Sequence, residues 1–265
     1  MRVAFAGSPE AAVPVLRALA ASPHEVALVV TQPDRPRGRS GRATPTPVAA
    51  AADGLGIPVL RPRSINLPES LDALEAADVG ALCVAAFGQI LKDGLLGRWP
   101  CINVHYSLLP AYRGAAPVER AIMDGLDRTG VTIMQMDAGL DTGPMISAEP
   151  VDIGPEEDAG ALTARLATVA GPLLVAALDD LAAGRLAPRP QPDEGVSLAP
   201  KITDEDRPLD FSRPARALAD QVRALAPHIG ATCTIGGQPF KVWRARARDE
   251  AAPPGLAGDG GRLVA

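Results

Sequence analysis

Val79-Gly-Ala-Leu-Cys-Val-Ala-Ala-Phe87 is an almost uninterrupted apolar run, and Cys101-Ile-Asn-Val-His105 is a second one soon after it. Continuous apolar runs of this length are typical of strands that are buried on both faces, as in a parallel sheet. Outward from this pair, other short apolar runs alternate with segments whose apolar residues recur at helical spacing. The expected strands are 2–6, 25–31, 57–60, 130–136 and 145–151, and the expected helices are 9–21, 47–55, 67–77, 116–124 and 156–183. This alternation predicts an α/β fold with a mostly parallel sheet.

The sequence pattern changes after residue 184, which we take as the end of a larger domain, 1–184. Residues 185–203 are rich in proline and polar side chains and are predicted to be a linker. Residues 204–265 begin with a helical pattern and continue as short alternating segments, which predict a small, mostly β domain. Within it, residues 241–248 alternate arginine with alanine, so we expect a strand with one basic face.

Composition limits the classes of function. The chain has 265 residues, 47% of them hydrophobic, which is enough for a packed core. Its formal net charge of -5 excludes nucleic-acid binding over the whole surface and leaves only local basic patches. The cysteines Cys83, Cys101 and Cys233 are odd in number and lack C-x-x-C spacing, so neither a disulfide framework nor a metal site is predicted. We see no signal peptide and no apolar run of membrane-span length, and we expect a cytoplasmic protein.

Reactive side chains gather in and after the second apolar run. A strand would present Asn103 and His105 on one face, because they are two residues apart. An amide donor beside an imidazole suits oxyanion stabilisation and acid/base chemistry. The later segment Asp137-Ala-Gly-Leu-Asp141-Thr-Gly143 carries two aspartates, and its glycines at 139 and 143 would let a tight loop bring a carboxylate to the imidazole. Each of these residues is common in a purely structural role, so the residues alone do not decide for catalysis.

Arginines gather at two places. The loop 34–42 is rich in proline and glycine and carries Arg35, Arg37, Arg39 and Arg42. Guanidinium groups match phosphate oxygens, so this loop is a candidate RNA contact, with a solvated surface loop as the other reading. The expected basic strand adds Arg244 and Arg246 as a second candidate patch.

The chain resembles the methionyl-tRNA formyltransferase family over nearly its whole length. The most specific stretches are 102–110, 112–117, 130–137 and 139–143, which follow one another in the family's order and spacing. The resemblance implies the Rossmann-like formyltransferase fold, followed by a small OB-like β-barrel that we expect to be shortened, because the chain stops at Ala265. It also implies transfer of the formyl group of 10-formyltetrahydrofolate to the α-amine of methionyl-initiator tRNA, by a monomer that uses no metal.

The resemblance assigns roles to individual residues. Asn103 would steady the oxyanion, His105 would handle protons or stabilise charge, and Asp141 would orient His105, with Thr132 supporting the reaction centre. The implied folate contacts are Phe87, Gly88, Ile90, Ser107, Leu108, Leu109 and Pro110. The implied tRNA contacts are Arg37, Arg39, Arg42, Arg244 and Arg246.

The sequence also departs from the family pattern. Tyr106 stands where glycine is frequent and Ala11 where phenylalanine is frequent, so we expect a narrower pocket and looser packing there. Three other functions stay open. The first is formylation of another amine, such as glycinamide ribonucleotide or a nucleotide-linked amino sugar. The second is RNA binding without catalysis. The third is hydrolysis that releases formate from the folate.

Overall fold

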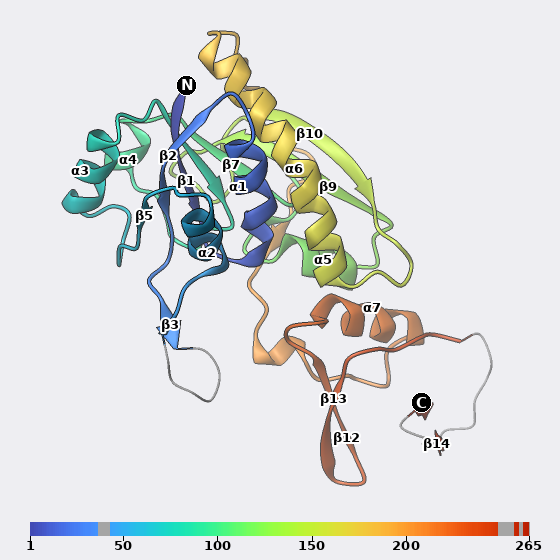
Figure 1. Ribbon diagram of the computed structural model, residues 1–265. Coiled ribbons are helices and arrows are strands. Elements are labelled where there is room, and N and C mark those ends of the chain that lie inside the picture. The colour runs from blue at the N-terminus through green and yellow to red at the C-terminus, as the bar shows by residue number, and fades with distance from the viewer. Residues whose placement is uncertain (37–42, 249–256, 260–261, 265) are drawn as a thin grey trace.

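A seven-stranded sheet forms the centre of the computed structural model, which describes residues 1–36, 43–248, 257–259 and 262–264 (Figure 1). Its strand order is β10-β9-β7-β6-β1-β2-β5. The strands are β1 (Arg2–Gly7), β2 (Glu25–Val30), β5 (Val59–Leu60), β6 (Ala81–Ala85), β7 (Cys101–His105), β9 (Arg128–Gln135) and β10 (Met145–Asp152). The strands from β7 to β5 are parallel, whereas β9 and β10 are antiparallel to their neighbours. The predicted α/β fold with a mostly parallel sheet is confirmed.

Helices cover both faces of this sheet. The helices are α1 (Val13–Ala20), α2 (Pro47–Gly54), α3 (Pro68–Ala76), α4 (Asp93–Leu96), α5 (Pro117–Met123) and α6 (Ala159–Ala182), with a short 3-10 turn, η1 (Glu10–Ala12), before α1. Alternate residues of β1 belong to two separate cores: Val3 and Phe5 pack with α1 and α6, whereas Ala4 and Ala6 pack with α3 and α4. Successive side chains of a strand point to opposite faces of the sheet, so each face of β1 packs against a different set of helices.

Helix α6 is the longest element and lies across the sheet beside α1 (Figure 1). Asp158 caps its start, because its Oδ1 accepts a hydrogen bond from the amide of Ala161 at 2.8 Å. By length and composition α6 would be able to span a membrane, which corrects the expectation that no apolar run was long enough. Leu162, Leu166 and Leu174 are fully buried in the core, and this packing accounts for the apolar composition.

The C-terminal part begins with β11 (Leu198–Ala199) and η2 (Asp204–Asp206), which lead to helix α7 (Ala215–Leu225). Two antiparallel strand pairs follow: β12 (Ala231–Ile235) with β13 (Gln238–Val242), and β14 (Ala257–Asp259) with β15 (Arg262–Val264). Helix α7 packs against α5 of the larger part (Figure 1). These strands make the C-terminal part antiparallel, and the OB-like barrel stays a prediction.

The prediction of a basic strand over residues 241–248 is correct only for residues 241 and 242. Strand β13 ends at Val242, and residues 243–248 form no strand. Trp243, Arg244 and Arg246 are all exposed, so the arginine–alanine alternation does not separate a buried face from a solvated one. Alternation alone specifies a strand only where a partner strand and a core are present, and the described residues give 243–248 neither.

Two short strand pairs were not expected from the sequence. Strand β3 (Arg35–Pro36) pairs with β4 (Ala43–Thr44) at the base of the arginine-rich loop. Strand β8 (Arg113–Gly114) pairs with β11, so part of the segment predicted as a linker is a strand that pairs with the larger part of the molecule.

Candidate active site

Strand β7 carries the candidate residues on one face of the sheet. Ile102 and Val104 point into the core below α1 and α6, so Asn103 and His105 lie on the opposite face. Their exposed fractions are only 8% and 5%. The predicted common face is therefore present, and the surroundings of each side chain decide what it is able to do.

The His105 ring is held from both sides by oxygen atoms. Its Nε2 lies 2.8 Å from the main-chain oxygen of Tyr112, and its Nδ1 lies 3.7 Å from Oδ2 of Asp141. The second distance is too long for a hydrogen bond but short enough for an ion pair when the ring is protonated. The same Asp141 oxygen accepts a hydrogen bond from the amide of Gly114 at 2.8 Å. Sequence reasoning missed Tyr112 and Gly114 because they act through main-chain atoms.

The loop that carries Asp141 arrives from an unexpected direction. Because β9 runs antiparallel to β7, this loop starts beside the first residues of β7 and not beside His105 at its end. There the amide of Met136 donates to the oxygen of Cys101 at 2.8 Å. The loop then folds back until Asp141 reaches His105. Gly143 makes this return possible, because a Cβ at that position would collide with the main-chain oxygen of Gln135.

Asn103 has an amide side chain that is unpaired within the described residues. Its side chain makes no hydrogen bond to any residue that the structure describes, although the side chain is almost buried. The amide is not among the fully enclosed unpaired side-chain atoms of the described chain, so an incoming oxygen atom is able to reach it. The amide of Asn103 is therefore free to donate to an oxygen placed beside His105.

The turn after β7 is fixed by buried hydroxyl groups. Thr132 Oγ1 donates to the oxygen of Ser107 at 2.7 Å and accepts from the amide of Leu109 at 3.1 Å. Ser107 Oγ donates to the oxygen of Ala111 at 2.6 Å, so this hydroxyl is already used within the turn. Leu109 is buried, whereas Leu108 and Pro110 are partly exposed. Of these candidate folate contacts, Leu108 and Pro110 are the more accessible.

Tyr106 packs away from the His105 ring. Its side chain belongs to the core between the sheet and α1, and its hydroxyl donates to the main-chain oxygen of Ala11 at 2.8 Å. Burial raises the pKa of the Tyr106 hydroxyl well above its usual range. The two departures from the family pattern thus contact each other, and the large side chain at 106 lies beside the small one at 11.

The other candidate folate contacts follow β6, the neighbour of β7. Phe87 is buried, while Gly88 is exposed and has a φ of +77°. Ile90 is 80% exposed, which is unusual for a large apolar side chain. Gln32 Nε2 donates to the oxygens of Phe87 and Gly88 at 3.3 and 3.1 Å, so it fixes this loop against the end of β2.

The candidate tRNA contacts divide into two groups. Arg37, Arg39 and Arg42 lie outside the described residues. Arg244 and Arg246 line a cavity of about 680 Å³ together with Trp243 and side chains of α7. This surface is of mixed charge, because Arg246 forms an exposed ion pair of 2.7 Å with Glu156.

Comparisons with known proteins identify the family. Residues 1–178 match the family model described as formyl transferase, and residues 201–265 match the formyl transferase C-terminal domain. The chain is 50% identical to the methionyl-tRNA formyltransferase of Bordetella pertussis over 264 residues, which are 95% of the chain and 85% of that relative. The chain belongs to the methionyl-tRNA formyltransferase family. The methionyl-tRNA formyltransferase of Halorhodospira halophila is 46% identical and aligns with 100% of the chain and 87% of its own length.

Solved structures support the same fold. The N-formyltransferase of Helicobacter canadensis, in complex with folinic acid and dTDP-3-aminofucose, superposes with a TM-score of 0.73. The alignment covers 97% of this chain and 92% of that one at 17% identity, so the likeness shows the fold alone. Together with the sheet order, it confirms the formyltransferase fold for this member of the methionyl-tRNA formyltransferase family.

Proposed function

We propose that this chain transfers the formyl group of 10-formyltetrahydrofolate to the α-amino group of methionyl-initiator tRNA. The relatives that match nearly the whole chain are named for this activity. The observation that carries the proposal is the cluster of Asn103, His105 and Asp141 on one face of β7, with an unpaired amide beside an imidazole. The reaction takes place in the cytoplasm, where charged tRNA is used, and we propose a monomer as the active form.

The reaction forms one C–N bond and breaks another. The neutral α-amine attacks the formyl carbon, and the electron pair of the carbonyl moves to its oxygen. Collapse of this intermediate breaks the bond between the carbon and N10 of the folate. The amine loses one proton and N10 gains one, so the products are formylmethionyl-tRNA and tetrahydrofolate.

Each residue of the cluster has a distinct part in these steps. The Asn103 amide donates to the developing oxyanion, because it has no competing partner in the described chain. His105 moves a proton between the two nitrogens, or stabilises the charge that develops there. Asp141 and the oxygen of Tyr112 orient the imidazole from opposite sides. Thr132 keeps the turn after β7 in place and touches no reacting atom in this scheme.

The folate lies against the loops after β6 and β7 in this proposal. One side of the folate site is formed by Phe87, Gly88 and Ile90. The other side is formed by the turn of Ser107, Leu108, Leu109 and Pro110. Both loops are adjacent, because Ala85 of β6 pairs with Val104 of β7. The exposed side chain of Ile90 offers an apolar surface to an aromatic ring of the folate. Packing of the ring on this surface would remove apolar area from water and so stabilise binding.

The tRNA is held by arginines outside this cluster. Arg37, Arg39 and Arg42 contact the acceptor stem, and Arg244 and Arg246 contact phosphates further along the tRNA. The ion pair between Arg246 and Glu156 is exposed, and such pairs contribute only about 0–1 kcal/mol, so a phosphate is able to replace the carboxylate.

An acceptor assay tests the proposal. The purified 265-residue chain is given 10-formyltetrahydrofolate with charged methionyl-tRNA, glycinamide ribonucleotide or a nucleotide-linked amino sugar in turn, and free formate is measured in each case. We expect formyl transfer to methionyl-tRNA at a kcat/KM at least 100-fold above that for the other amines. Faster transfer to another amine would replace the substrate, and formate release without transfer would replace the reaction.

A further inference from the structure

Residues 189–199 pass along the edge of the candidate active site, and we call them the strap. The strap was predicted as part of a linker, but its main chain is paired at both ends. Arg189 exchanges two hydrogen bonds of 2.8 Å with Met145, and β11 pairs with Arg113 and Gly114 of β8. The strap is therefore in fixed contact with both loops that surround His105.

Gln191 lies in the strap and contacts the loop of Asp141. Its Nε2 donates to the main-chain oxygen of Asp141 at 2.7 Å and to that of Gly143 at 2.8 Å. Its Oε1 accepts from Nε and Nη2 of Arg113 at 3.0 and 2.7 Å. A guanidinium only donates, so Arg113 fixes the orientation of the amide and directs its two N–H groups at the loop.

The loop needs such support because Asp141 has an unfavourable backbone. Its φ is +51°, in the left-handed region that residues other than glycine seldom adopt. A residue with a side chain is strained in this region, and the conformation persists only where neighbouring groups hold it. Gln191 bonds to the carbonyl of Asp141 itself and to that of the residue two positions later. These bonds hold the peptide units whose rotation would relax the loop.

The same segment holds the other side of His105. Tyr112, whose oxygen accepts the His105 contact, also has a positive φ, of +59°. Its amide donates to Oγ of Ser197 in the strap at 2.9 Å. Both strained residues beside the imidazole are thus hydrogen-bonded to side chains of one segment.

We propose that Gln191 is a positioning residue of the active site, which keeps the Asp141 carboxylate beside Gly114 and His105. The inference rests on the proposed function for its effect on rate. Gln191 touches no reacting atom, and its action passes through the backbone of Asp141. Loss of the Nε2 donor would let the loop relax, and the carboxylate would move away from the Gly114 amide and the imidazole.

Amide hydrogen exchange tests this without any substrate. The Gly114 amide bonds to the Asp141 carboxylate, whereas the neighbouring amides of Arg113 and Ala115 bond to main-chain oxygens of the strap. In Gln191→Met, which keeps the length of the side chain and removes its donor, we expect the Gly114 amide to exchange at least 10-fold faster. Arg113 and Ala115 should be unchanged. Unaltered exchange at Gly114 would overturn the proposal, and so would an equal rise at all three amides, which would mean that the strap itself had loosened.

Two further variants separate the donor from the rest of the side chain. Gln191→Glu keeps the acceptor for Arg113 but loses the donor, so it should give the same rise at Gly114 as the methionine variant. Wild-type exchange in Gln191→Glu would assign the role to Arg113 and contradict the proposal. Asp193→Ala changes an exposed residue of the same strap and is the control that should match the wild type.

Kinetics then connect the contact with catalysis. A small displacement of a catalytic group lowers rates strongly, so kcat for formyl transfer should fall about 10- to 100-fold in Gln191→Met, with KM for both substrates within 2-fold. When Gln191→Met is added to an Asp141→Asn enzyme, kcat should fall less than 2-fold further, because both substitutions act through the Asp141 carboxylate. Full additivity would show that Gln191 acts elsewhere. If the wild type transferred no formyl group to methionyl-tRNA, the proposed function would fail, while hydrogen exchange would still decide the role of Gln191.

Discussion

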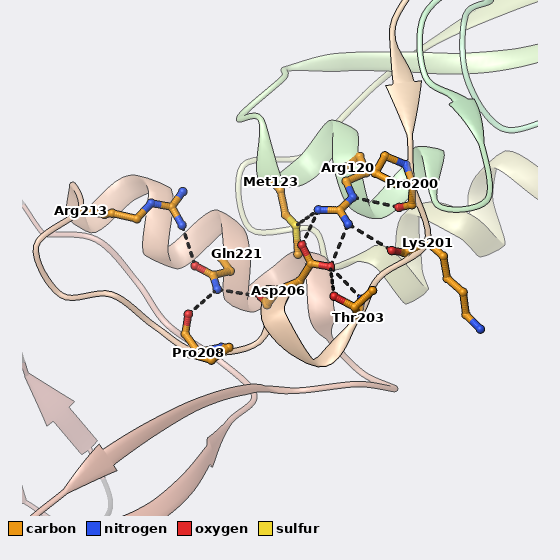
Figure 2. Close-up of polar contacts among 9 residues, drawn as sticks. All are labelled: Arg120, Met123, Pro200, Lys201, Thr203, Asp206, Pro208, Arg213 and Gln221. Carbon is orange, nitrogen blue, oxygen red and sulfur yellow. Dashed lines mark hydrogen bonds and ion pairs between the residues drawn. The ribbon is translucent and has the colours of Figure 1, made fainter.

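Arg120 of α5 binds both carboxylate oxygens of Asp206, with Nη1 2.6 Å from Oδ1 and Nη2 2.8 Å from Oδ2 (Figure 2). Arg120 also donates to the main-chain oxygens of Pro200 and Lys201, at 3.0 and 3.3 Å. Both charged side chains are about one-fifth exposed, at 19% and 20%. One guanidinium therefore joins the larger part of the molecule to the segment that leads into α7.

Arg120→Ala should lower the free energy of unfolding by about 2–3 kcal/mol, because it leaves the partly buried Asp206 carboxylate without its charged donor. Arg128→Ala is the matched control, because its ion pair with Asp152 is exposed and screened by solvent, so its loss should barely change the free energy of unfolding. Chemical denaturation of both variants gives the comparison. Equal losses in the two variants would show that the Arg120 contact has no special weight.

The stability that Asp206 contributes should disappear in acid. The hydrogen bond from Arg120, followed by those from Thr203, holds the pKa of the Asp206 carboxyl below its usual value. A carboxyl with a lowered pKa in the folded state stabilises the fold above its unfolded pKa of about 3.9, and loses this effect as the pH falls through the folded pKa. The gap in unfolding free energy between wild type and Asp206→Asn should be constant from pH 7 to 5 and shrink below pH 4. A gap that stayed constant to pH 2.5 would contradict this linkage.

Asn103→Ala should lower kcat about 100- to 1000-fold, because removal of one oxyanion donor typically costs about 3–4 kcal/mol of barrier. The KM for folate should change little, since the contact forms only as charge develops on the oxygen. Steady-state kinetics measures both constants. His228→Ala, which alters an exposed histidine far along the chain, should behave as wild type. A loss confined to KM would mean that Asn103 only binds the ground state.

Arg39→Ala and Arg246→Ala should raise the KM for methionyl-tRNA several-fold and leave the KM for folate within 2-fold. Phosphate contacts release counterions, so tRNA binding by the wild type should weaken with added salt, and each variant should show a shallower salt dependence. Binding titrations at two or more salt concentrations measure this. Arg128→Ala serves again as the exposed-arginine control. An unchanged salt slope in both variants would remove these arginines from the tRNA surface.

Much of the fold was predictable because its strands are local apolar runs. The bounds of β7 were predicted as Cys101–His105 and are confirmed, since a run buried on both faces has an unambiguous start and end. The direction of β9 was not predictable, because strand direction depends on the path of the connecting chain and not on local pattern. Residues 241–248 misled us, since alternation carries no information about whether a partner strand exists.

The candidate site was predictable only in its side chains. Asn103 and His105 are reactive types two residues apart, and the resemblance to the family added Asp141 from a later glycine-containing loop. Main-chain groups such as the Gly114 amide leave no mark in the sequence. Gln191 stands between two prolines in a segment typical of a linker, and its contacts join residues some 50 positions apart, at 2.7 and 2.8 Å. Only the folded chain reveals that it contacts the Asp141 loop.

Single-turnover formyl transfer by His105→Ala is the most direct measurement. Enzyme loaded with 10-formyltetrahydrofolate is mixed with charged methionyl-tRNA, and the rate is compared with that of the wild type, alongside the Kd for folate. We predict a rate at least 100-fold lower with a Kd within 2-fold, because acid/base and electrostatic help from the imidazole acts only during the reaction. A near-normal transfer rate in His105→Ala would contradict the account.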